Sequence, residues 1–172
     1  MSSDQLEAVS RLYERHATAV HAYALRRSDR ETADEVTAQV FLVAWRRRSS
    51  VPDEALPWLY GVARRVLADQ RRGASRRRRL GERLRGVTIE DSHELALPDR
   101  GLTSALRRLS ETDREALLLC YWEGLEHAQM AQVMGCSRAA VTVRLHRARR
   151  RLRRELENED HEPSCVVEAH SG

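Results

Sequence analysis

The sequence predicts an all-α protein made of two small helical domains joined by a flexible linker. Apolar residues recur at helical spacing in both halves of the chain, and this periodicity fails between residues 73 and 99. An apolar content of 41% with a single Phe suits two modest cores. We therefore expect an N-terminal bundle of three to four helices over 4–72, a linker over 73–99, a C-terminal four-helix domain over 100–157 and a disordered tail over 158–172.

Three helices are expected in the N-terminal domain. The first covers about residues 4–27, where neither Gly nor Pro interrupts the apolar spacing. Asp29 can cap a second helix that runs to about Arg47. A turn through Pro52 leads to the third helix, whose first turn tolerates Pro57.

Charge is segregated along the chain, although the net charge is only +4. Residues 71–86 hold eight Arg against one Glu, and residues 138–157 hold eight Arg against two Glu. Two basic segments of similar strength indicate two places that contact phosphate. A solvated linker is the alternative explanation for Arg71, Arg72 and the run Arg76–Arg79.

The C-terminal domain ends in the pattern of a helix-turn-helix. Ser110 can cap the helix that precedes this motif. Within residues 126–154, Gly135 permits a left-handed exit from the first helix and Ser137 can cap the second. The second helix has one inward apolar seam, formed by Val141, Leu145, Ala148 and Leu152.

The face opposite this seam is strongly basic. Most charge runs are solvated surface helices, and that is the simplest explanation for an isolated one. A short preceding helix, a Gly turn, a cap and a basic outer face together match the geometry by which a second helix enters the major groove. The sequence therefore predicts DNA binding.

Composition excludes several chemistries. All 30 basic residues are Arg, so there is no lysine for a phosphate-binding loop or a Schiff base. The three cysteines lack paired spacing, and the one candidate metal set, His161, Cys165 and His170, lies in the expected tail. Neither a secretory signal nor an apolar run of about 18 residues occurs. We expect a cytoplasmic protein that is not an enzyme and uses no metal or cofactor.

Three segments together resemble a known family: ADEVTAQVFLVAW (33–45), PWLYGVARRVLADQRR (57–72) and the helix-turn-helix. In this order and spacing they are similar to bacterial RNA polymerase sigma factors of the extracytoplasmic-function type, over about residues 8–157. The resemblance implies a protein that binds core RNA polymerase, through its β′ and β subunits, and directs it to promoter DNA. The resemblance also suggests an anti-sigma factor as a further partner.

The segment matching 33–45 packs in that family on the coiled coil of the β′ subunit, with an acidic pair that Asp34 and Glu35 match. Two family positions that usually hold Gln-Glu are Ala38-Gln39 here, and a usual Arg is Val43. Core packing is the alternative role for the two aromatic residues of this segment. The polymerase-binding candidates are Asp34, Glu35, Gln39, Phe41 and Trp45.

The third helix corresponds to the part of the family that recognises and melts the −10 element. The candidates are Trp58, Tyr60, Arg65, Asp69 and Arg72. Stacking a base on an aromatic ring contributes about 1–3 kcal/mol, although a Trp at a helix start is more often buried. Asp69 and Arg72 match the family, whereas Arg65 replaces an Asn and favours phosphate contact over base reading.

The second helix of the helix-turn-helix corresponds to the reader of the −35 element. Positions matching the family are Ser137, Val141, Arg144, Leu145, Arg147, Ala148 and Arg149. Departures at Ala139, Ala140, Thr142 and Val143 predict a −35 sequence unlike a typical one. The candidate −35 contacts are Arg138, Thr142, Val143, Arg144, His146, Arg147, Arg149 and Arg150.

A dimeric helix-turn-helix regulator is the alternative function. Such a regulator needs a dimer seam or a ligand pocket in its N-terminal half. Residues 33–72 instead match polymerase-binding and promoter-melting segments. The sequence therefore favours a sigma factor.

Overall fold

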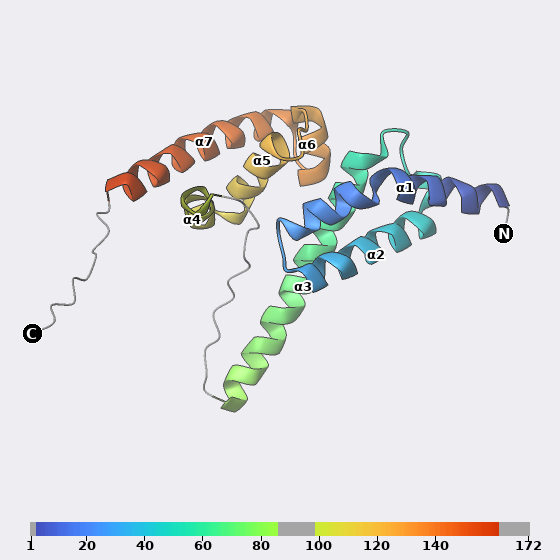
Figure 1. Cartoon of the computed structure of the whole chain (residues 1–172), viewed down its shortest axis with the longest axis horizontal. Coiled ribbons are helices and arrows are strands. Elements are labelled where there is room, and N and C mark those ends of the chain that lie inside the picture. The colour runs from blue at the N-terminus through green and yellow to red at the C-terminus, as the bar shows by residue number, and fades with distance from the viewer. Residues whose placement is uncertain (1–2, 86–98, 162–172) are drawn as a thin grey trace, which may run out of the picture.

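The computed structural model describes residues 3–85 and 99–161. Within these ranges the protein is all-helical, as the sequence predicts. The N-terminal unit consists of α1 (Ser3–Leu25), α2 (Arg30–Arg46), a 3₁₀ turn (Arg48–Ser50) and α3 (Ala55–Arg85). The C-terminal unit consists of α4 (Arg100–Arg108), α5 (Glu111–Tyr121), α6 (His127–Met134) and α7 (Arg138–His161) (Figure 1).

The helix caps expected from the sequence are present. The Asp29 carboxylate accepts a hydrogen bond from the Thr32 amide at 2.8 Å, and the Ser110 hydroxyl accepts one from the Asp113 amide at 3.2 Å. Gly135 ends α6 with a φ of 65°, in the left-handed region that favours glycine. These caps satisfy backbone groups that a helix end would otherwise leave unpaired.

Helix α3 is longer than the sequence predicts. We expected a linker from Gly73, but α3 continues to Arg85. A single helical Gly costs only about 1 kcal/mol relative to Ala, and Arg is a good helix former, so Gly73 does not end the helix. The rest of the expected linker, residues 86–98, lies outside the described residues. Helix α7 likewise continues to His161, past the expected start of the tail at residue 158.

Each unit buries an apolar core from all of its helices. Val20, Val40 and Leu59 are fully buried in the N-terminal unit, where α1, α2 and α3 pack on one another. Leu106, Leu117 and other leucines fill the C-terminal core, where α7 packs on α4, α5 and α6. These two cores agree with the expected fold class.

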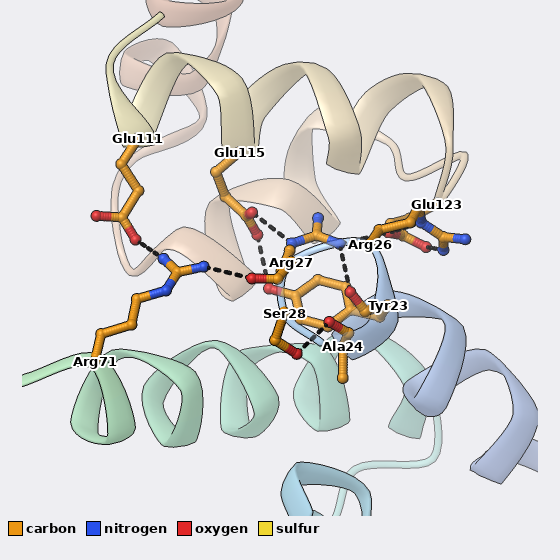
Figure 2. A network of polar contacts seen from close by, with 9 residues as sticks. All are labelled: Tyr23, Ala24, Arg26, Arg27, Ser28, Arg71, Glu111, Glu115 and Glu123. Atoms are coloured by element: carbon orange, nitrogen blue, oxygen red, sulfur yellow. Dashed lines mark hydrogen bonds and ion pairs between the residues drawn. The ribbon is translucent and has the colours of Figure 1, made fainter. Parts of the chain in front are cut away.

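The two units also pack against each other. Helix α3 of the N-terminal unit contacts α6 of the C-terminal unit, as Figure 1 shows. The approach is close at Gly61, where an added Cβ would lie 3.8 Å from the Val133 Cα. The end of α1 meets α5 through the polar residues of Figure 2. Nothing in the local sequence pattern predicts this contact.

Candidate nucleic-acid interface and its surroundings

The helix-turn-helix has the predicted inward seam. Val141, Leu145 and Ala148 are buried, and Leu152 is half-buried at the edge of the core. The Ser137 hydroxyl accepts a hydrogen bond from the Ala140 amide at 3.1 Å and so caps α7. The seam fixes the rotation of α7, and this in turn fixes which side chains face outward.

The outward face carries most of the predicted −35 residues. Arg138, His146, Arg147 and Arg150 are exposed, and Val143 is 50% exposed. In the described part of the chain, the side chains of Arg138, Arg147 and Arg150 have no hydrogen bond or ion pair. These three guanidinium groups are therefore available for a ligand, and the neighbouring apolar Val143 can contact a thymine methyl group.

The other three predicted −35 residues contact the C-terminal unit itself. The Thr142 hydroxyl lies 3.2 Å from His127 Nδ1 on α6. The Arg149 Nε donates to the Tyr121 hydroxyl at 2.7 Å, and its guanidinium lies 5.4 Å from the centre of that ring. Arg144 is half-buried, and its Nε has no hydrogen-bond partner among the described residues.

The predicted −10 residues on α3 divide into buried aromatic and exposed charged groups. Tyr60 is only 3% exposed, and its ring stacks on Tyr23 with centroids 4.8 Å apart. Burial, helped by the charge of Glu123, raises the pKa of Tyr60 to about 12. Trp58 is half-buried against the core. In this arrangement Tyr60 is therefore unavailable to stack on a base.

The charged −10 candidates lie on the exposed face of α3. Arg65, Asp69 and Arg72 are all exposed. Asp69 forms an ion pair with Arg72, one helical turn away. Because both side chains are well exposed, this pair contributes little stability and leaves Arg72 able to exchange partners.

The acidic pair expected to bind polymerase is exposed on α2. Asp34 lies 2.8 Å from His21 Nε2, and Glu35 accepts a hydrogen bond from the Gln70 amide at 3.1 Å. Gln39 is exposed on the same helix. Leu42, which sequence reasoning missed, is 47% exposed three residues after Gln39, and therefore on the same face.

The two aromatic candidates of α2 differ. Phe41 is 7% exposed and packs edge-on against Tyr13 with centroids 4.8 Å apart, so it belongs to the core, which was the alternative role. Trp45 is half-buried, and the Arg48 guanidinium lies 5.9 Å from its ring. Of the two, only Trp45 has surface to offer a partner in this arrangement.

The contact between the units is centred on the buried guanidinium of Arg27 (Figure 2). Its Nε donates to Glu115 at 2.7 Å, and its Nη1 donates to Glu123 at 2.9 Å and to the Tyr23 carbonyl at 2.9 Å. The Tyr23 hydroxyl donates to Glu115 at 2.7 Å. Arg26 forms a second ion pair with Glu123. We call these five residues the Arg27 network.

Burial makes this network energetically important. Desolvation alone would raise the pKa of Glu115. The charge and hydrogen bond of Arg27, with the Tyr23 hydrogen bond and the charge of Arg64, outweigh it and hold that pKa below its usual range. A buried charge that loses its only counter-charge is strongly destabilising. At the edge of the network, Arg71 of α3 pairs with Glu111 and donates to the Arg27 carbonyl at 2.9 Å.

Sequence reasoning missed the Arg27 network, although a partial signal existed. Glu115 lies three and four residues before Leu118 and Leu119, so the helical period places a carboxylate beside buried leucines. A charge at such a position requires a partner. The partner lies 88 residues earlier in the chain, where no local pattern points to it.

No metal site or membrane span is found within residues 3–85 and 99–161. This part of the chain has no group of three His, Cys, Asp or Glu side chains able to hold a metal. It also has no helix with the length and apolar character needed to cross a membrane. Cys165 and His170 of the candidate metal set lie outside the described residues.

An exposed basic helix, held in place by a capped helix-turn-helix, is typical of proteins that bind DNA. Residues 12–77 match the family described as Sigma-70 region 2, and residues 99–152 match Sigma-70, region 4. The chain is 34% identical over 154 residues to the ECF RNA polymerase sigma factor SigL of Mycobacterium tuberculosis, covering 85% of this chain and 87% of the relative.

Two further matches agree with this family. The ECF RNA polymerase sigma factor SigC of Mycobacterium tuberculosis is 35% identical over 138 residues, or 77% of this chain and 75% of the relative. The solved structure of the sigma factor RpoE with the anti-sigma factor NepR from Bartonella quintana matches with a TM-score of 0.70 at 25% identity, covering 86% of this chain and 96% of the other. The protein belongs to the ECF family of RNA polymerase sigma factors, which direct transcription initiation.

Proposed function

We propose that the two units divide the work of a sigma factor. The N-terminal unit holds core polymerase through the exposed face of α2 and contacts the −10 element through α3. The C-terminal unit reads the −35 element through the outward face of α7. The observation that carries this proposal is the row of exposed guanidinium groups on α7 that have no ion pair within the described residues.

Both elements are engaged together only when the units separate. Elements at −10 and −35 lie about 25 base pairs apart, which is about 85 Å of B-DNA. In the packed arrangement α3 contacts α6, the helix next to α7 in the helix-turn-helix. Separation would also remove Glu123 of the C-terminal unit from beside Tyr60, although Tyr23 of the N-terminal unit would still stack on that ring. The packed form is thus proposed as the form of the free protein.

Polymerase binding is assigned to Asp34, Glu35, Gln39 and the newly noted Leu42. Charge reversal at the acidic pair, with Asp34→Arg and Glu35→Arg, should weaken binding to core polymerase at least tenfold, because two favourable charges become repulsive. The measurement is co-purification and titration with core polymerase, with circular dichroism as the check on folding. Asp53→Arg, exposed in the bend before α3 and therefore outside α2, is the control. If the double variant binds core polymerase as tightly as the unaltered protein, the assignment of polymerase binding to Asp34 and Glu35 is wrong.

The whole assignment is tested by run-off transcription with core polymerase on genomic fragments, followed by mapping of start sites. A sigma factor gives discrete starts downstream of a shared pair of sequence elements. A dimeric regulator gives none without another sigma factor. The cytoplasm, where core polymerase acts, is the proposed location, and an anti-sigma factor is a proposed partner, since RpoE is solved with NepR.

A further inference from the structure

A cleft lined mainly by charged side chains lies where the two units pack together. It has a volume of about 770 Å³ and lies between α3 of the N-terminal unit and α4 and α5 of the C-terminal unit. Clefts of about 300–1,000 Å³ are typical of small-molecule sites. Eight arginines and two glutamates line it, a formal charge of +6: Arg26, Arg27, Arg64, Arg65, Arg71, Arg72, Arg107, Arg114, Glu111 and Glu115.

Half of these arginines already have carboxylate partners. Arg26 and Arg27 belong to the Arg27 network, Arg71 pairs with Glu111, and Arg72 pairs with Asp69. The other four have no hydrogen bond or ion pair in the described part of the chain: Arg64, Arg65, Arg107 and Arg114. The cleft therefore has four guanidinium groups without a directly bonded counter-charge, although the charge of Glu115 still acts on Arg64 and Arg114.

Burial makes the positive charge of the cleft energetically unfavourable. Arg114 is half-buried, and desolvation, followed by the charge of Arg71, lowers the pKa of its guanidinium. Arg27, which also lines the cleft, is 6% exposed, and its buried Nη2 has no hydrogen-bond partner among the described residues. Unsatisfied buried donors and crowded like charges both favour an anion.

We propose that this cleft binds a small anion carrying several phosphate groups. Planar guanidinium groups match phosphate oxygens in a two-pronged geometry, which makes arginine the preferred residue for such a ligand. The free arginines come from both units, with Arg64 and Arg65 on α3, Arg107 on α4 and Arg114 on α5. The anion therefore bridges the units and stabilises the packed form by mass action.

The consequence for transcription rests on the proposed function. Arg65 and Arg72 line the cleft and are also proposed contacts of the −10 element. An anion in the cleft therefore competes with promoter DNA, both by occupying these side chains and by holding the units together. The phosphate groups of a nucleic-acid strand could bind the same arginines as a small polyphosphate. The experiment therefore also measures binding of a single-stranded oligonucleotide.

The test is titration of the full chain with inorganic tripolyphosphate at about 0.15 M salt, followed calorimetrically, without polymerase or promoter. We expect saturable binding of one ligand per chain. Arg64→Gln in one unit and Arg114→Gln in the other should each weaken binding about tenfold or more, because each removes a charge-assisted hydrogen bond. Arg153→Gln, exposed on α7 and outside the cleft, is the matched control and should bind like the unaltered protein.

Thermal melting provides the second readout. Tripolyphosphate should raise the melting temperature of the unaltered protein by more than that of Arg114→Gln at the same ligand concentration. If Arg114→Gln does not fold, the exposed Arg107→Gln replaces it. Equal losses in all variants, the control included, would mean diffuse attraction to a basic protein and overturn the proposal. Binding of a single-stranded oligonucleotide through the same arginines, without tripolyphosphate binding, would overturn it in favour of a nucleic-acid surface. Either failure leaves the run-off transcription test of the sigma assignment unaffected.

Discussion

Arginines of the inter-unit contact and arginines of α7 are the same residue type in opposite environments. Arg27 is buried and held by two glutamates and a backbone carbonyl, whereas Arg147 and Arg150 are exposed without a partner in the described part of the chain. The buried group is fixed in one geometry and holds two units together. The exposed groups keep their hydrogen-bonding capacity for a ligand. The comparison shows that charge alone does not assign a role to an arginine in this protein.

The largest effect should come from making the inter-unit contact permanent. A cross-link is placed across the close approach of α3 and α6 with Gly61→Cys and Val133→Cys, where an added Cβ at Gly61 lies 3.8 Å from the Val133 Cα. Cys120, Cys136 and Cys165 are changed to Ser, and non-reducing electrophoresis checks that the disulfide forms. We expect the oxidised protein to lose nearly all promoter-dependent run-off transcription and the reduced protein to regain it. Gly61→Cys alone, in the same Ser background, is the control. Full activity of the oxidised form would contradict the need for separation.

Removing one partner of the Arg27 network should have the next largest effect. Glu115→Ala leaves the buried Arg27 guanidinium with Glu123 alone, which Arg26 shares, and this costs up to about 3–5 kcal/mol if the units stay packed. If they separate instead, Arg27 becomes hydrated and the radius of gyration increases. Urea unfolding and small-angle scattering distinguish these outcomes. Glu111 pairs with Arg71 and has a side chain that is 66% exposed, so Glu111→Ala should cost less than about 1 kcal/mol. A Glu115→Ala protein unchanged in both measurements would contradict the role of the network.

Acid should weaken the same contact by a smaller amount. The folded pKa of Glu115 is lowered below its ordinary value of 4.5, so its stabilisation is present above pH 4.5 and is lost as the pH falls through the lowered value. The stability difference between the unaltered protein and Glu115→Gln should therefore shrink between pH 7 and about pH 3. Urea unfolding at the two pH values measures it. A difference that stays constant would show that Glu115 does not act through its charge.

Local chemistry made much of the fold predictable. Asp29, Ser110 and Ser137 cap helices as their residue types indicate, and Gly135 adopts the left-handed conformation expected after α6. The inward seam of α7 followed from its helical period, and with it the outward face. Such features depend on residues within a few positions of one another, which a single sequence records directly.

Contacts between segments that are distant in the sequence could not be predicted from local residue patterns. Tyr60 reads as an aromatic available for base stacking, but Tyr23, 37 residues earlier, covers its ring. Arg27 and Glu115 each look like surface charges until their helices meet. The length of α3 was also missed, because Gly73 is a weak helix breaker when good helix formers surround it. Tertiary contacts determine the burial of Tyr60 and the pairing of Arg27 with Glu115. The summed helix propensities of neighbouring residues determine the length of α3.

The most direct test of the account compares Arg147→Ala with Arg150→Ala across promoters that vary at every −35 position. An arginine paired with a guanine edge discriminates by about 1–3 kcal/mol, so Arg147→Ala should reduce −35-dependent transcription about tenfold and relax preference at one base pair. Arg150→Ala should weaken all promoters alike and lower the salt dependence by about one phosphate contact. Val143→Ser should instead change preference at a neighbouring pair. A uniform loss with unchanged preference for Arg147→Ala would contradict the proposed reading face of α7 and leave the helix only an electrostatic anchor.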